Sequence, residues 1–330
     1  MKLSLVIPVF NDNAGLAGLL AQVAELGIAH EVIVVDDGSD PPCRAHFPQD
    51  PVPGARMVWL RTEAGLGAGH ARNLGQAAVT GTHALFMDAD DTFTPGITTL
   101  LHDLAGRRFD FCLFAHHDSR LLARGDTGPQ EPPDRAFWAQ VAPGAVPRLM
   151  TQEEARVLCR LSNYPWNKVW RAGFLRDAAV RCTEIPLHND IEMHWAGFLS
   201  GRARLVSGRH CVVHHVASGR AQLSNRRGAE RARMFEALEA VAVRLEAEIA
   251  RDPASAGFVG PYLEFVCRLT GWARTRLDAG ETALMSTRAE AFARALAQRA
   301  SPALSAAVED ALADEPGLAA RFLAVFGQGR

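Results

Sequence analysis

The chain has 330 residues, of which 48% are hydrophobic and 22% are charged, and its formal net charge at pH 7 is -2. This composition is typical of soluble globular proteins and excludes disordered and fibrous chains. Proteins that bind nucleic acid usually carry a clear basic excess, so we expect no nucleic-acid partner. The six cysteines are scattered without a CxxC pair. This argues against a disulfide framework or structural zinc and favours a reducing, cytoplasmic location.

Short apolar strands and amphipathic helices alternate through the first hundred residues. We predict strands over residues 3–9, 31–36, 57–60 and 83–87. Helices are expected after Asn13 and over 70–80, where apolar residues recur at helical spacing. Apolar strands that alternate with helices are typical of an α/β fold, with a mostly parallel sheet flanked by helices. Ligands of such sheets bind at the carboxyl ends of the strands.

The pattern changes after residue 110. Residues 117–148 are rich in proline, glycine and charge, which predicts a long loop or lid. Residues 151–216 mix short strands and helices. From about residue 228 onward the spacing of apolar residues predicts helices, with breaks near 252, 279 and 316. We therefore expect a helical appendage at the C-terminal end of the chain.

The run Asp88-Ala89-Asp90-Asp91 directly follows the fourth predicted strand. Carboxylates at positions i and i+2 of a turn can both reach one hard divalent cation or its waters. Mg²⁺ and Mn²⁺ at such sites often bridge to substrate phosphates. A solvated acidic turn is the alternative explanation, because aspartate is a common turn former.

Two other motifs precede this acidic turn. Residues 36–39 (Asp-Asp-Gly-Ser) end the second strand, where a carboxylate could bind a base edge or simply form a turn. Residues 65–75 (Gly-Leu-Gly-Ala-Gly-His-Ala-Arg-Asn-Leu-Gly) open a helix, and their glycines would let an anion approach helical N–H groups. His70 or Arg72 stands where a dinucleotide fingerprint has its third glycine, which argues against nicotinamide binding.

These motifs are more specific in combination than alone. In chain order they are residues 5–11 (Leu-Val-Ile-Pro-Val-Phe-Asn), 34–39 (Val-Val-Asp-Asp-Gly-Ser), 69–75 (Gly-His-Ala-Arg-Asn-Leu-Gly) and 85–91 (Leu-Phe-Met-Asp-Ala-Asp-Asp). This arrangement resembles the inverting family 2 glycosyltransferases of the GT-A fold. Residues 164–170 (Tyr-Pro-Trp-Asn-Lys-Val-Trp) are similar to a segment of the polysaccharide-biosynthesis members of that family.

The resemblance implies roles for the matching residues. The implied substrate-binding residues are Pro8, Val9, Phe10, Asp37, Arg72, Asp88, Ala89, Trp166 and Lys168. Among them, Asp37 would hydrogen-bond the base, usually uracil, and Arg72 would contact the nucleotide. Asp88 and Asp90 would hold the divalent cation, Mn²⁺ or Mg²⁺, on the donor diphosphate.

The catalytic base that the resemblance implies comes later in the chain. Asp190 matches the aspartate of the family's usual Glu-Asp pair, whereas Asn189 stands where the glutamate would be. Glu192 competes with Asp190 for this role. His214 or His215 is a further candidate for binding the metal or the diphosphate, although a histidine at a strand end is commonly structural.

We therefore expect a metal-dependent inverting glycosyltransferase of the hexosyltransferase class. It would move a sugar from a nucleotide-diphosphate donor, a UDP-sugar by preference, to a hydroxyl of a glycan or glycolipid acceptor. Residues 1–109 would form the nucleotide-sugar-binding half, and 110–227 the acceptor-side half with the lid and the base. The helices of 228–330 would brace the fold, form a homodimer or lie against a membrane. The enzyme would be cytoplasmic, or peripheral at the inner face of the membrane.

Two other functions remain open at this point. A nucleotidyltransferase that makes sugar nucleotides shares the sheet architecture. It normally begins with a glycine-rich, arginine-containing loop after the first strand, unlike residues 8–12 (Pro-Val-Phe-Asn-Asp). A degenerate, non-catalytic module that binds a glycan or nucleotide would be expected to lose its carboxylates, yet Asp37, Asp88, Asp90 and Asp190 are all present.

Overall fold

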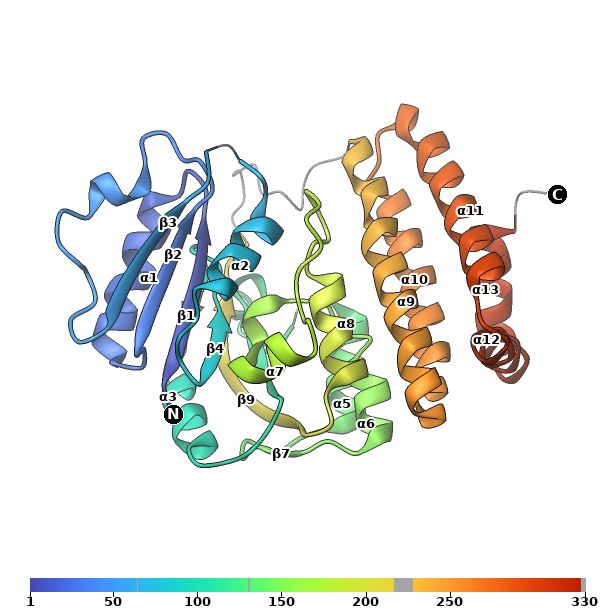
Figure 1. Cartoon of the computed structure of the whole chain (residues 1–330), viewed down its shortest axis with the longest axis horizontal. Helices are drawn as coiled ribbons and strands as arrows, with labels where there is room; N and C mark the ends of the chain where they lie inside the picture. The colour runs from blue at the N-terminus through green and yellow to red at the C-terminus, as the bar shows by residue number, and fades with distance from the viewer. Residues whose placement is uncertain (64, 130, 217–227, 328–330) are drawn as a thin grey trace.

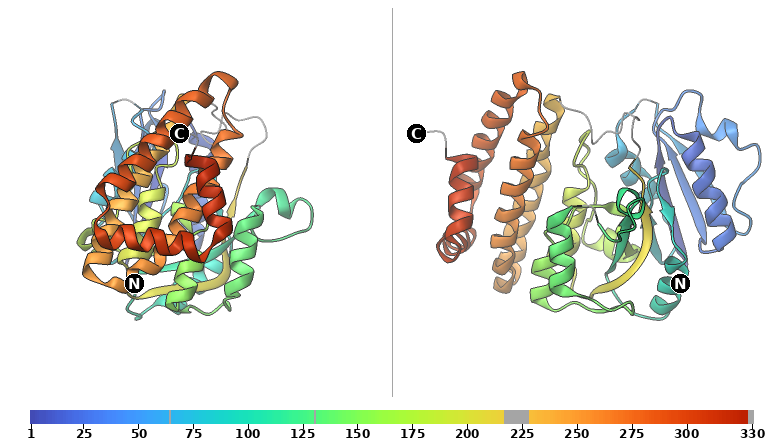
Figure 2. Two further views of the ribbon diagram at one scale, coloured as in Figure 1. Left: turned by 90° about the vertical axis from the view of Figure 1, so that its right-hand side faces the viewer. Right: turned by 180° about the vertical axis from the view of Figure 1, so that it is seen from behind.

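The computed structural model describes residues 1–63, 65–129, 131–216 and 228–327. A mixed sheet flanked by helices occupies one side of the molecule, and the C-terminal helices stack beside it (Figures 1 and 2). Among the described residues the strand order is β3-β2-β1-β4-β8-β6-β9-β5, with β7 paired to β9. The strands are β1 (Leu3–Val9), β2 (Glu31–Asp36), β3 (Arg56–Arg61), β4 (His83–Phe86), β5 (Thr92–Phe93), β6 (Phe111–Asp118), β7 (Arg148–Leu149), β8 (Lys168–Arg171) and β9 (Arg204–His214).

The first four strands in sequence order are apolar throughout their centres because helices cover both faces of this part of the sheet. Along β1, Val6 packs into one core, whereas Leu5 and Ile7 pack into the other. The α-helices in chain order are α1 (Asn13–Leu26), α2 (Ala68–Ala77), α3 (Gly96–Leu104), α4 (Ser119–Leu122), α5 (Pro132–Val141), α6 (Gln152–Leu158), α7 (Ala172–Asp177), α8 (Ile191–Ser200), α9 (Met234–Arg251), α10 (Val259–Arg274), α11 (Thr282–Arg299), α12 (Pro302–Asp314) and α13 (Pro316–Phe326).

Strands β1 to β4 are parallel, as the sequence predicts, so their carboxyl ends meet at one edge of the sheet. The other half is mixed: β8 runs antiparallel to both β4 and β6, and β9 is parallel to β6. The predicted α/β class is therefore confirmed, with more antiparallel pairing than the strand pattern of the first hundred residues suggests. The predicted helix over 70–80 begins two residues earlier and ends at Ala77.

The predicted loop over 117–148 is wrong in four places. Strand β6 continues to Asp118, α4 follows it directly, α5 forms a helix whose Phe137 is buried, and β7 begins at Arg148. Pro132 and Pro133 suggest a loop from the sequence, but they occupy the first turn of α5. Proline is well tolerated there because an N–H group in the first turn of a helix has no partner within the helix. What remains of the predicted lid lies between these elements, and residue 130 is outside the described part.

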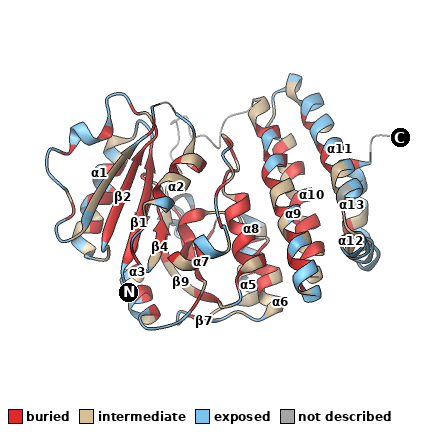
Figure 3. Cartoon of the chain, viewed as in Figure 1, coloured by how far each residue is buried: buried red, intermediate tan, exposed pale blue. Residues whose placement is uncertain are grey.

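The C-terminal helices share a core with the sheet domain. Trp195 of α8 packs against Tyr262 and Phe265 of α10, with ring centroids 5.5 Å apart in both pairs. Buried residues line the facing sides of α8, α9 and α10, while α11 to α13 are more exposed (Figure 3). Within the described residues, no helix combines the length and the hydropathy that a membrane crossing requires.

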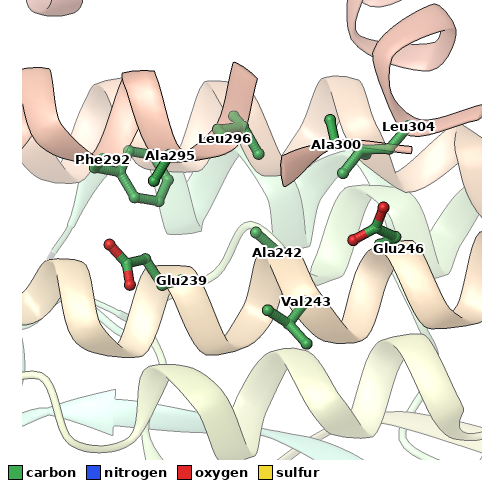
Figure 4. A pocket seen from close by; sticks show the side chains of 9 residues that line it. All are labelled: Glu239, Ala242, Val243, Glu246, Phe292, Ala295, Leu296, Ala300 and Leu304. Carbon is green, nitrogen blue, oxygen red and sulfur yellow. The ribbon is translucent and has the colours of Figure 1, made fainter. Parts of the chain in front are cut away.

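A small pocket lies between α9 and the α11–α12 pair, lined by residues such as Glu239, Val243 and Phe292 (Figure 4). Its cavity volume is about 30 Å³. A cavity of this size holds about one water molecule. The pocket is therefore too small for a sugar or a nucleotide.

The packing of α2 on the sheet gives a test of this architecture. A Cβ on Gly75 would lie 2.5 Å from Val6 Cγ1 and 3.0 Å from Val35 Cγ2. Gly75→Ala should therefore push α2 off β1 and β2 and destabilise the protein by about 1–3 kcal/mol in urea unfolding. Gly18→Ala in α1 is the matched control, because a Cβ there meets nothing within 4 Å. It should stabilise by roughly 0.5–1 kcal/mol; equal effects of the two changes would contradict the packing.

Candidate active site

The carboxyl ends of β1, β2 and β4 bring Phe10, Asp37 and Asp88 to one edge of the sheet. The ends of β1 and β2 are held in register there, because Asp37 N donates a hydrogen bond to Val9 O at 2.8 Å. Pro8 and Val9 are buried within β1, where Pro8 lies opposite Val35 of β2. Phe10, by contrast, is 54% exposed. The residues from the end of β1 that the sequence predicts for a base pocket thus include one exposed aromatic ring.

The Asp37 carboxylate anchors the loop that precedes α2. It accepts hydrogen bonds from Thr62 Oγ1 (2.9 Å), Leu66 N (3.0 Å) and Gly67 N (2.7 Å). Leu66 is 53% exposed, so it forms a second exposed apolar side chain near Asp37. A Cβ built on Gly65 would lie 3.7 Å from Phe10 Cε2 and 3.5 Å from Asp37 O. The loop before α2 is therefore in close contact with Phe10 and Asp37, as a pocket for the nucleotide base would require.

A cluster of negative charge lies beyond β4. Asp88 accepts a 2.6 Å ion-paired hydrogen bond from Arg72 Nη2. Burial, together with the negative charges of Asp88 and Asp91, raises the pKa of Asp90 to about 6. Ala89 is nearly buried between the two aspartates. A nearby cation would stabilise the ionised form of Asp90, because it would offset both repulsions.

These carboxylates have the chemistry that Mg²⁺ or Mn²⁺ prefers, and the crowding around Asp90 would be relieved by a positive charge. Across the residues that the structure describes, no group of three or more His, Cys, Asp or Glu side chains is arranged to hold a metal ion. Asp88 and Asp90 therefore fit a cation that takes its remaining ligands from phosphate and water, as Mg²⁺ commonly does. They do not fit a closed structural metal site.

The structure adds Asp91 to this cluster, a residue for which the sequence pattern predicts no role. Asp91 is fully buried, and its Oδ1 lies 3.0 Å from His214 Nδ1 and accepts from His215 N at 2.7 Å. This pair links the turn after β4 to the end of β9. A carboxylate at Nδ1 fixes the tautomer and orientation of an imidazole. His214 is therefore held beside the aspartates, whereas the His215 ring contacts Thr92 Oγ1 at 2.8 Å.

The two candidates for the base face different surroundings. Asp190 immediately precedes α8, and the charges of Arg72, Asp88 and Lys168 act on it. Glu192, the second residue of α8, accepts a hydrogen bond from Thr183 Oγ1 at 2.7 Å and lines a hollow of about 370 Å³ beside α9. Burial raises the pKa of Asp190 to about 6 against the opposing effect of Arg72. Asp190 is therefore close enough to Arg72 and Asp88 to feel their charges, whereas Glu192 faces α9.

Lys168 and Trp166 are both buried, at 1% and 0% exposure. Lys168 Nζ donates to Tyr164 O at 2.8 Å and to Asn167 Oδ1 at 2.6 Å. Burial lowers the pKa of Lys168 to about 7, while Asp190 raises it. The Trp166 ring stacks on Tyr164 with centroids 4.4 Å apart. Direct contact of either side chain with a substrate stays a prediction. In the structure both are buried, and the Trp166 ring lies against that of His214, with centroids 5.4 Å apart.

The Asp91–His214 pair gives a pH-dependent test. Burial lowers the pKa of His214, but the hydrogen bond and charge of Asp91 outweigh this, so the pKa is raised overall. The pair therefore stabilises the fold below the unfolded-state pKa of about 6.5. That contribution is lost as the pH rises through the folded-state pKa. Asp91→Asn should lower the pKa of His214 in an NMR titration, with the signal assigned by His214→Gln. An unchanged pKa would contradict the pairing.

Comparisons with known proteins bear on the fold and on the N-terminal part of the chain. Residues 4–127 match the family model described as glycosyl transferase family 2. No curated protein matches the sequence. The structure of S. aureus TarS 1-349 in complex with UDP-GlcNAc is similar over 99% of this chain and 89% of that one, with a TM-score of 0.74 and 19% identity. The complex of TarS 1-349 with UDP covers 100% and 92%, with a TM-score of 0.69 and 18% identity.

A mannosyltransferase with another bound nucleotide sugar is also similar in structure. The mannosyltransferase PcManGT from Pyrobaculum calidifontis, in complex with GDP-Man and Mn²⁺, is similar over 98% of this chain and 85% of that one. Its TM-score is 0.53 and its identity 16%. At these identities the structural likeness establishes the fold, and the match to the family model is confined to the N-terminal region. Residues 4–127 thus match glycosyl transferase family 2, and the chain has the GT-A-like fold of these structures.

Proposed function

We propose that this protein is a metal-dependent, inverting glycosyltransferase that transfers a sugar from a UDP-sugar to a hydroxyl of a glycan or glycolipid. One observation carries the proposal: Arg72 is paired with Asp88 at 2.6 Å, and its charge also acts on Asp190. The carboxylate expected at the donor diphosphate and the carboxylate expected to act as base thus belong to one charge network. This is the arrangement that displacement at an anomeric carbon requires.

Donor binding would use the edge of the sheet. The exposed Phe10 ring and the Asp37 loop would hold the nucleotide base, with Asp88 and Asp90 at the diphosphate. Asp88 and Asp90 would hold Mn²⁺ or Mg²⁺, which would supply charge neutralisation for the leaving nucleoside diphosphate. The likeness to transferases bound to UDP-GlcNAc and UDP supports a uridine donor, and the likeness to one bound to GDP-Man makes GDP the natural comparison.

The acceptor hydroxyl needs a base within hydrogen-bond reach. Asp190 is the carboxylate that we assign to this role, because Glu192 is bonded to Thr183 and lines the hollow beside α9. A single base that activates the hydroxyl on the face opposite the leaving group inverts the anomeric configuration. A raised pKa suits this residue, since a general base works best when its pKa is close to the working pH.

The proposal is tested first by nucleotide binding. UDP with Mn²⁺ should raise the melting temperature of the wild-type protein, and UDP alone should raise it much less. Asp90→Ala should remove the metal-dependent part, because it deletes a carboxylate assigned to the cation. GDP with Mn²⁺ is the matched comparison. Stabilisation by UDP that is the same in Asp90→Ala, or independent of metal, contradicts the proposed donor site.

The base is tested by transfer assays after a screen of UDP-sugars has found the donor. Asp190→Asn should reduce transfer by roughly 10²–10⁴-fold while leaving UDP affinity intact, since the amide cannot accept the proton. Glu192→Gln is the control and should retain activity. In the wild type, transfer requires ionised Asp190, so it should be lost as the pH falls through about 6. Activity that survives in Asp190→Asn and disappears in Glu192→Gln would reassign the base.

A further inference from the structure

Helix α2 lies between the sheet and the segment 180–189, which leads directly to Asp190 (Figure 1). One side of α2 packs on β1 through Gly75. The other side hydrogen-bonds the segment: Asn73 and the Cys182 backbone exchange two bonds of 2.9 Å, and Gln76 Nε2 donates to Val180 O at 2.8 Å. Helix α2 is thus held to the segment at several successive points.

The contact becomes closest at the start of α2. A Cβ on Gly69 would lie 2.6 Å from Thr183 O and 2.9 Å from Asn189 Cβ, so only glycine allows this approach. One turn later, Arg72 is 6% exposed and its two terminal nitrogens bind different groups. Nη1 donates to Asn189 Oδ1 at 2.8 Å, and Nη2 donates to Asp88 Oδ1 at 2.6 Å.

We infer that α2 is a positioning element that sets the place of Asp190 relative to Asp88, with Arg72 and Asn189 as its central positioning residues. This inference rests on the proposed function, because it explains what holds the carboxylate at the donor diphosphate, Asp88, at a fixed distance from the proposed base, Asp190. The run 65–75, whose glycines in sequence suggest an anion-binding turn, acts here through the contacts of α2 with the segment. Gly69 permits the approach, Arg72 bridges the two carboxylate-bearing loops, and Asn73 fixes the segment.

The neutral side chain at position 189 has a definite consequence. Asp88 is the carboxylate that pairs with Arg72, and Asn189 shares the guanidinium without adding charge. The groups whose charge acts on Asp190 are Arg72 from α2, Asp88 after β4 and Lys168 of β8, while the neighbouring Cys182 is a neutral thiol because burial raises its pKa. A carboxylate at 189 would compete with Asp88 for Arg72 and add negative charge next to Asp190.

The test compares Asn189→Asp and Asn189→Ala with Gln76→Ala. Gln76 bonds the same segment from the same helix face, but through an uncharged contact with Val180 O. The first readout is the pKa of Asp190 from carboxyl ¹³C NMR, assigned with Asp190→Asn. The second is kcat for transfer against KM for the donor. Melting temperatures report any general loss of stability.

Asn189→Asp should raise the pKa of Asp190 and move the acidic limb of kcat to higher pH. Asn189→Ala should lower kcat by about tenfold or more with donor KM little changed, because small misplacement of a reacting group costs rate. Gln76→Ala should lower the melting temperature and leave both readouts unchanged.

The inference is overturned if Asn189→Asp leaves the NMR titration of Asp190 unchanged, or if Asn189→Ala alters kcat no more than Gln76→Ala. The two proposals fail separately. Absence of transfer by the wild type would contradict the proposed function, whereas the NMR comparison judges the positioning role without any turnover.

Discussion

The arrangement of this site depends on a buried guanidinium placed among carboxylates. Parallel strands deliver Asp37 and Asp88 to one edge of the sheet, and the segment before α8 brings Asp190 to the same region. Burial raises the pKa of Asp90 and of Asp190 to about 6 each, and repulsion from the neighbouring carboxylates adds to this effect. Arg72 offsets part of it by pairing with Asp88, and against the effect of burial this pairing raises the pKa of Arg72 itself.

Much of the donor half follows from the sequence. Apolar runs identify β1, β2 and β4, and the parallel arrangement then requires the polar residues after them to meet. The antiparallel insertion of β8 between β4 and β6 could not be predicted in this way, because the pairing joins segments far apart in the chain. The same holds for the contacts of Asp91 with His214 and of Arg72 with Asn189, which span 123 and 117 positions. Local periodicity carries no information about such partners.

Burial also changes how some residues are interpreted. Trp166 and Lys168 lie in a motif that suggests substrate contact, yet both are buried. Asp37, expected at the base, already holds the loop before α2 through three hydrogen bonds. The same residues can shape a pocket without reaching the ligand with their own polar atoms. The glycine-rich motif is a similar case, since the side chains of α2 reach from the sheet to the segment that carries Asp190.

A structure of the wild-type protein bound to UDP and Mn²⁺ tests the central claim most directly. The account predicts that the anomalous signal of Mn²⁺ lies between the diphosphate and Asp90, with the uracil beside Phe10 and Asp37, and with the Arg72 bridge to Asp88 and Asn189 intact. Asp190 should face the open side of the donor, opposite the diphosphate. UDP bound elsewhere, for instance in the hollow beside α9, or a metal ion remote from Asp90, would contradict it.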